Sequence, residues 1–90
     1  MMQDLEKLRE EIDKIDDEIL SQLSKRKSIA KEIAKIKKAM GKPVFDRRRE
    51  QQLIKKLKSK EKGLDENFIG SLYKIIIKNS KEEQEKIVKK

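Results

Sequence analysis

The chain contains no cysteine and no histidine. These absences exclude disulfide bonds, thiolate nucleophiles, imidazole general bases and the Cys/His ligand sets of zinc fingers. Any chemistry must therefore use arginine, lysine, carboxylate, hydroxyl, amide or phenol groups. Aromatic residues make up only 3% of the chain, which leaves few rings on which nucleic-acid bases could stack.

Residues that break regular structure are also few, with one proline and three glycines in 90 residues. Only 34% of the residues are hydrophobic and 47% are charged, so a single copy has little apolar surface to bury. Association with another copy would compensate, and the sustained helical periodicity argues against disorder. The length predicts one stand-alone domain over residues 1–90.

Basic residues outnumber acidic ones by 25 to 17, and the net charge of +8 suits anionic partners. For most of the lysines, the simplest interpretation is a Lys/Glu-rich surface of the thermophile type. The N-terminus lacks the apolar segment of a signal peptide, and no stretch is long enough to span a bilayer. We therefore expect a cytoplasmic protein with no membrane partner.

The hydrophobic pattern predicts an all-α chain of three helices, long, short and medium. Apolar residues spaced three and four apart predict a first helix over about residues 4–40. A loop over 41–45 leads to a second helix over about 46–61, and a third covers about 65–88. The first helix is too long for two shorter ones to cover, so we expect an intertwined homodimer of six helices.

Residues typical of helix ends mark these boundaries. Gly41-Lys42-Pro43 ends the first helix, because proline holds the preceding residue out of the helical region. Asp46 and Asp65 are suitable N-caps for the second and third helices. Gly63 is the expected C′ residue of the second helix.

Polar residues interrupt the apolar faces of the long helices. Arg26 lies on the apolar stripe and Lys37 at its edge, eleven residues apart. This separation of about three helical turns points both cations the same way. Ser80 and Gln84, four residues apart, interrupt the third helix in the same manner. Burying an unpaired cation is costly, so the fold must supply carboxylates or an anionic ligand must bind.

Two further positions are candidates for ligand binding. The second helix opens with Asp46-Arg47-Arg48-Arg49-Glu50. Three arginines oppose the positive end of the helix dipole, so Arg49 and Glu50 are candidates for binding a ligand. Arg9 lies about 25 Å along the helix from Arg26. If both bind one small ligand, Arg9 must come from the partner subunit.

Taken together, these residues resemble the all-helical chorismate mutases, and the resemblance covers nearly the whole chain. Four segments carry it in order: Leu8-Arg9-Glu10-Glu11-Ile12-Asp13 followed by Ile15-Asp16, then Arg26 with Lys37, then Pro43-Val44 with Asp46 and Arg49-Glu50, and finally Ile76-Ile77 with Ser80 and Gln84.

The resemblance implies an isomerase that rearranges chorismate to prephenate in phenylalanine and tyrosine biosynthesis, without metal or cofactor. This Claisen rearrangement is pericyclic and needs neither a nucleophile nor a proton transfer. Such an enzyme must hold a flexible dianion in its reactive shape. It must also stabilise the negative charge that develops on the ether oxygen.

The resemblance also implies how the substrate carboxylates are bound. Arg26 and the partner subunit's Arg9 would clamp the two carboxylates through bidentate hydrogen bonds. Ser80 and Arg49 would complete this part of the site.

The same resemblance assigns the remaining contacts to the reacting centre and the ring hydroxyl. Lys37 and Gln84 would donate hydrogen bonds to the ether oxygen, and Lys37 would also reach a carboxylate. Glu50, helped by the backbone at Asp46, would accept the ring hydroxyl. The expected catalytic residues are thus Lys37, Gln84, Glu50 and Arg26. The chain departs from the expected pattern at Lys81-Glu82-Glu83, which is more polar than expected beside such a pocket.

Three alternatives remain open from the sequence. An isochorismate-pyruvate lyase would use similar cations on the same scaffold, although Asp46 and Arg49-Glu50 favour the mutase. A basic nucleic-acid-binding module fits the net charge, but the aromatics are few and the lysines alternate with acids. A coiled-coil scaffold would not place Arg26 and Lys37 on an apolar stripe. We therefore expect chorismate, and not nucleic acid, as the partner.

Overall fold

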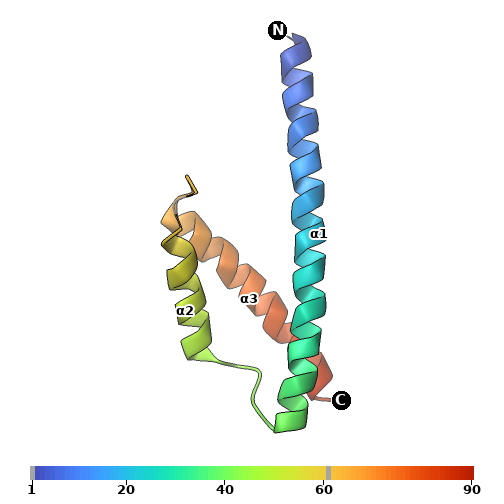
Figure 1. Cartoon of the computed structure of the whole chain (residues 1–90), viewed down its shortest axis with the longest axis vertical. Helices are drawn as coiled ribbons and strands as arrows, with labels where there is room; N and C mark the ends of the chain where they lie inside the picture. Colours follow the sequence, from blue (N-terminus) through green and yellow to red (C-terminus); the bar gives the residue numbers. More distant parts are fainter. Residues whose placement is uncertain (1, 61) are drawn as a thin grey trace.

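Three helices form the part of the chain described by the computed structural model, residues 2–60 and 62–90. They are α1 (Met2–Met40), α2 (Arg47–Lys58) and α3 (Glu66–Val88), and no strand occurs among these residues. The predicted all-α class and helix order are confirmed. In Figure 1, α1 runs the length of the molecule, and α3 runs diagonally from the far end of α2 toward the C-terminal end of α1.

The C-terminus of α1 closes in a Schellman motif. Gly41 has a φ of 67°, a conformation that glycine adopts without steric cost. Its N–H donates to the Lys38 carbonyl at 3.2 Å, and the Lys42 N–H donates to the Lys37 carbonyl at 2.8 Å. The chain therefore turns sharply after α1, and loop 41–46 leads to α2, which packs against α3.

Aspartate caps begin the other two helices, as predicted. The Asp46 carboxylate accepts a hydrogen bond from the Arg49 N–H at 3.0 Å. The Asp65 carboxylate accepts one from the Phe68 N–H at 3.1 Å. Each bond satisfies an N–H group that has no partner within its own helix. These caps fix the point at which α2 leaves the loop, and therefore where its first side chains lie.

The C-terminus of α2 differs from the prediction. The helix ends at Lys58, with Ser59 as its C-cap. The Ser59 hydroxyl donates to the Lys56 carbonyl at 2.6 Å and so helps to satisfy the helix end. The predicted end at about Glu61 lies outside the described residues. The expectation that Gly63 is the C′ residue is wrong, because Gly63 lies in the turn after the helix, with a φ of 73°.

The buried apolar core is small. α3 packs against both α1 and α2, and it contributes part of this core. The short side chains of Ala30 and Ala34, one turn apart on α1, are buried and permit a close approach of α3. The buried apolar residues among those described are Ala30, Ala34, Val44, Ile69 and Ile77.

The molecule is correspondingly elongated. Its radius of gyration is 16.9 Å and its principal extents are 59 × 27 × 14 Å. A compact chain of this length would have a radius of gyration of about 12 Å. The difference arises because the N-terminal half of α1 projects beyond the other two helices (Figure 1).

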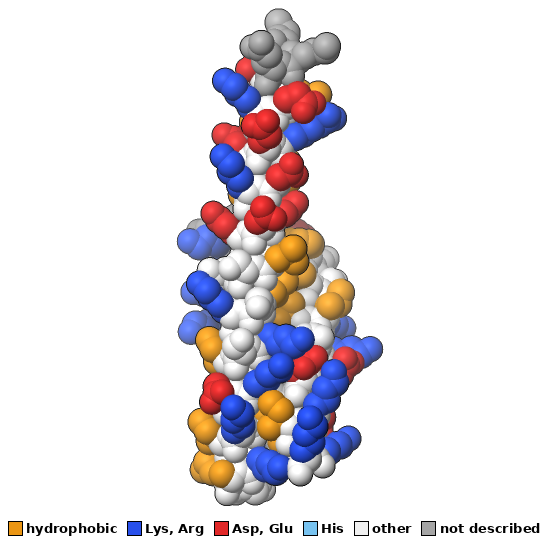
Figure 2. Space-filling view, turned by 90° about the vertical axis from the view of Figure 1, so that its right-hand side faces the viewer, with side chains coloured by type: hydrophobic (Ala, Val, Ile, Leu, Met, Phe, Trp, Pro, Cys, Tyr) orange, Lys and Arg blue, Asp and Glu red, His pale blue; other side chains and the backbone are white. Residues whose placement is uncertain are grey.

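The apolar stripe of α1 is uncovered within one chain. Leu8, Ile12 and Ile15 have 56%, 56% and 54% of their surface exposed. Figure 2 shows acidic and basic side chains on the projecting part of α1 and exposed hydrophobic side chains farther along the molecule. Apolar residues that recur every three or four positions along an exposed helix face are typical of interaction surfaces. None of the described helices is both long and apolar enough to cross a membrane.

Candidate active site

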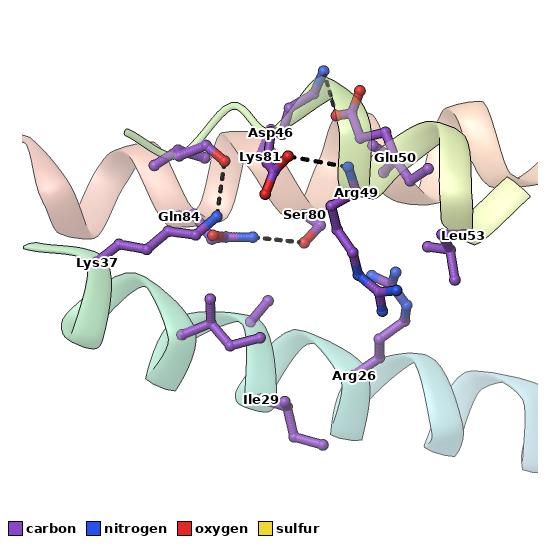
Figure 3. Close-up of a pocket in the computed structure, with 14 residues that line it drawn as sticks. Arg26, Ile29, Lys37, Asp46, Arg49, Glu50, Leu53, Ser80, Lys81 and Gln84 are labelled. Atoms are coloured by element: carbon purple, nitrogen blue, oxygen red, sulfur yellow. Dashed lines mark hydrogen bonds and ion pairs between the residues drawn. The ribbon is translucent and has the colours of Figure 1, made fainter. Parts of the chain in front are cut away.

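A cavity of about 370 Å³ lies where α1, loop 41–46, α2 and α3 meet (Figure 3). This volume falls within the range of roughly 300–1,000 Å³ that is usual for small-molecule sites. Apolar side chains from all three helices form part of its wall. The wall residues are Ile29, Ala30, Ile33, Val44, Leu53 and Ile77, together with the polar residues Arg26, Lys37, Asp46, Arg49, Glu50, Ser80, Lys81 and Gln84.

The structure brings seven of the eight predicted site residues to this one cavity. The eighth, Arg9, lies on the projecting part of α1, where its guanidinium pairs with Glu6 at 3.3 Å. Seventeen residues of helix separate Arg9 from Arg26, a distance of about 25 Å. Arg9 therefore cannot complete the cavity of its own chain.

Lys37 is held at the cavity by its position at the end of α1. Its ammonium donates a hydrogen bond to the Val44 carbonyl at 2.8 Å. Its own carbonyl accepts the Lys42 N–H that closes the end of the helix. The half-buried side chain is thus oriented by the same loop that carries the chain from α1 to α2. An ammonium has three donors, so the bond to Val44 leaves two for a ligand.

Gln84 and Ser80 form a pair one turn apart on α3. The Gln84 amide donates from Nε2 to the Ser80 hydroxyl at 3.0 Å. Gln84 is buried, with 7% of its surface exposed, and its Oε1 has no hydrogen-bond partner among the described residues. A buried amide oxygen without a partner costs about 1–3 kcal/mol. Such an orphaned group beside a cavity indicates a place where a polar ligand or neighbouring side chain completes the bonding.

The two carboxylates in the cavity wall already have partners. Asp46 caps α2, as described above. Glu50, in the first turn of α2, pairs through Oε1 with the Lys81 ammonium at 3.0 Å. The Glu50 N–H also donates to the Asp46 carbonyl at 3.0 Å. Neither carboxylate forms an ion pair with the side chain of Arg26, Lys37 or Arg49.

Positive charge is therefore in excess within the cavity. Four cationic side chains and two carboxylates line it. Arg26 and Arg49 extend into it from α1 and α2, and neither forms an ion pair with any residue in the described part of the chain (Figure 3). Two guanidiniums on different helices can each bind a carboxylate in bidentate fashion. The cavity thus favours a small molecule with more than one negative charge.

An ion-pair cluster beside the cavity joins α3 to α1. Glu83 pairs with Lys86 at 3.3 Å and with Lys27 of α1 at 3.5 Å. The hydrogen bond from Lys86 holds the pKa of the Glu83 carboxyl below its usual value, partial burial opposes this, and the charge of Lys27 adds to the lowering. The ionised carboxylate therefore links the two helices directly next to Gln84.

Sequence reasoning missed two features of the site. It placed Lys81 in a polar flank, whereas Lys81 lines the cavity and pairs with Glu50. The sequence did contain a signal for this position. Lys81 follows Ile77 by four residues and precedes Gln84 by three, so it shares a helix face with two residues that line the cavity. The second feature, the Val44 carbonyl that holds Lys37, is a backbone group and leaves no signal in the sequence.

Comparison with known proteins identifies one family and several relatives whose names agree with it. The chain matches the family described as chorismate mutase type II over residues 8–85. It is 35% identical to the chorismate mutase of Methanocaldococcus jannaschii over 83 residues, covering 90% of this chain and 84% of that protein. It is 36% identical over 75 residues to the bifunctional chorismate mutase/prephenate dehydratase of Escherichia coli (strain K12), covering 81% of this chain but 19% of that protein. No solved structure matches significantly.

Proposed function

The chain belongs to the chorismate mutase type II family, and from that membership we propose how its cavity acts on chorismate. The protein is a chorismate mutase, an isomerase that forms prephenate. The observation that supports the assignment of the site is the gathering of seven predicted residues around one cavity with excess positive charge. A dianion with a ring hydroxyl and an ether oxygen matches this set of donors and acceptors.

The carboxylates of chorismate bind at the arginine side of the cavity. Arg26 and Arg49 reach this side from two helices, and the Ser80 hydroxyl lies on the third. Bidentate contacts would fix both the position and the plane of each carboxylate. Holding the substrate in its compact shape lowers the entropic part of the barrier, because the two reacting ends are already close together.

The ether oxygen lies between Lys37 and Gln84. As the carbon–oxygen bond breaks, negative charge develops on this oxygen, and donors already in place stabilise it. Lys37 can keep its bond to Val44 and still donate to the substrate. The Gln84 amide has a second hydrogen besides the one given to Ser80. Neither group transfers a proton during the rearrangement.

The ring hydroxyl is bound at the start of α2. Glu50 has one carboxylate oxygen paired with Lys81, which leaves the other to accept the hydroxyl hydrogen. The backbone at Asp46, fixed by the N-cap, supports this contact. This hydrogen bond orients the ring relative to the ether oxygen.

The complete site requires a second copy of the chain. The apolar stripe of α1 is exposed in one chain, and Arg9 lies too far from Arg26 to share its ligand. An intertwined homodimer of six helices would cover the stripe. It would also bring the partner subunit's Arg9 to the open side of the cavity, where it would clamp a substrate carboxylate. Each dimer would then hold two shared sites.

The experiment that tests this function follows chorismate by its absorbance in the presence of purified protein, with prephenate identified as the product. The expected result is turnover by the unmodified chain, lost in Lys37→Ala and retained in Lys38→Ala, where the exposed neighbouring lysine is removed. The same preparations are tested with isochorismate for pyruvate release. Release of pyruvate from isochorismate, without formation of prephenate from chorismate, would contradict the proposal and indicate the lyase.

A further inference from the structure

The Glu50 carboxylate is held by a lysine from another helix. Lys81 of α3 places its ammonium 3.0 Å from Oε1 of Glu50, and the two side chains are 34% and 23% exposed. A second contact fixes the ammonium, which lies 4.8 Å from the centre of the Phe45 ring. A cation over an aromatic face is attracted by the electron-rich ring. Lys81 is therefore oriented from both α2 and the loop before it.

This ion pair forms part of the wall of the cavity. Glu50 and Lys81 line the cavity on one side and, on the other, a shallow hollow that also includes Phe45 and Ile54. Figure 3 shows the pair bridging α2 and α3 at the edge of the site. The contact is therefore within reach of a bound ligand, unlike the ion pairs on the outer surfaces of the helices.

The position of Lys81 compensates the negative charge of Glu50. A carboxylate without a partner beside a dianionic substrate would repel it, and the repulsion is strengthened in a partly dry cavity. The Lys81 ammonium offsets this charge without removing the acceptor function of the carboxylate. It pairs with Oε1, which leaves Oε2 as a free acceptor for the substrate hydroxyl.

We propose that Lys81 is a positioning residue for the reaction, acting through Glu50 to fix and neutralise the carboxylate that accepts the substrate hydroxyl. The proposal rests on the role of Glu50 given under the proposed function. Lys81 itself makes no contact with the reacting atoms. Its effect should therefore depend entirely on Glu50, and it should be larger when the substrate carries the ring hydroxyl.

The first test is a double-mutant cycle on kcat/KM for chorismate. Lys81→Met should lower kcat/KM about tenfold, the size expected when a charge-assisted hydrogen bond is lost. Lys81→Arg should restore most of the activity, because it keeps the cation. In a Glu50→Ala background, Lys81→Met should have little further effect. Lys78→Met, which removes one exposed lysine from the same helix, is the matched control and should be unchanged.

The second test separates positioning from a merely structural link between α2 and α3. On a chorismate analogue with hydrogen in place of the ring hydroxyl, Lys81→Met should lose clearly less activity than it loses on chorismate, because only the repulsion from the uncompensated Glu50 carboxylate remains. Equal losses on both substrates, or additive losses in the double mutant, would overturn the proposal. Full activity of Glu50→Ala would instead overturn the role of Glu50, and an inactive unmodified chain would overturn the proposed function itself.

Discussion

At the scale of single residues, the proposed site should depend on the geometry of its donors more than on their charge. Arg26 illustrates this, because a lysine at its position would supply the same charge without the planar fork that grips a carboxylate. Lys37 and Gln84 likewise depend on their supports, the Val44 carbonyl and the Ser80 hydroxyl. Substitutions that preserve charge or size therefore test the account more sharply than truncations.

Arg26→Lys should lower kcat/KM by about a hundredfold, because a bidentate carboxylate contact becomes a single one. Steady-state kinetics with chorismate measures the loss, and circular dichroism checks that the fold is kept. Lys25→Arg, at an exposed neighbouring position, is the control and should behave like the unmodified chain. Activity of Arg26→Lys close to that of the unmodified chain would exclude the clamp role.

Gln84→Glu should make activity depend on pH. A carboxylate beside a developing oxyanion is repulsive, whereas a protonated carboxyl can donate a hydrogen bond to it. The variant should therefore be weak at neutral pH and gain activity as the pH falls. The measurement is kcat/KM across the pH range, with Gln52→Glu on the exposed face of α2 as the control. An unchanged profile for Gln84→Glu would show that this side chain does not face the ether oxygen.

At the scale of helices, the caps were predictable because the residues that form them are adjacent in sequence. Asp46 and Asp65 begin α2 and α3 as expected. The end of α2 was not predictable in the same way, because Ser59 caps it where a glycine several residues later was expected. The spacing of Lys81 could have placed it at the cavity, but its ion pair could not be predicted. Its partner Glu50 lies on another helix, and only the fold brings the two together.

The link between α1 and α3 should depend on pH. The pKa of Glu83 is lowered in the folded protein from its ordinary value of 4.5. Its contribution to stability is therefore complete above that ordinary value and is lost as the pH falls through the lowered folded value. Glu83→Gln should reduce the melting temperature at neutral pH, and the difference from the unmodified chain should shrink on acidification.

Thermal unfolding at several pH values measures this difference. Glu82→Gln, which changes an exposed neighbour of the same charge, serves as the control. A difference for Glu83→Gln that persists unchanged in acid would show that the carboxylate does not stabilise the contact through its charge.

At the scale of the whole molecule, the shape of the chain supports the proposed homodimer. Its buried core is small, its radius of gyration of 16.9 Å is large for its length, and the stripe on α1 faces solvent. The periodicity of the sequence predicted an apolar face along the entire first helix, and the structure shows that one chain cannot cover it. Seven of the eight predicted site residues share one cavity, whereas Arg9 lies away from it, so its proposed role depends on the proposed homodimer.

Mixed dimers test the shared site most directly. Arg9→Ala and Arg26→Ala should each be nearly inactive alone, since every site in either homodimer lacks one clamp. The two variants are then refolded together in equal amounts. They should recover about one quarter of the activity of the unmodified protein, because about half of the dimers are mixed and each mixed dimer has one intact site out of two. No recovery, with mixed dimers present, would contradict a site that takes Arg26 from one subunit and Arg9 from the other.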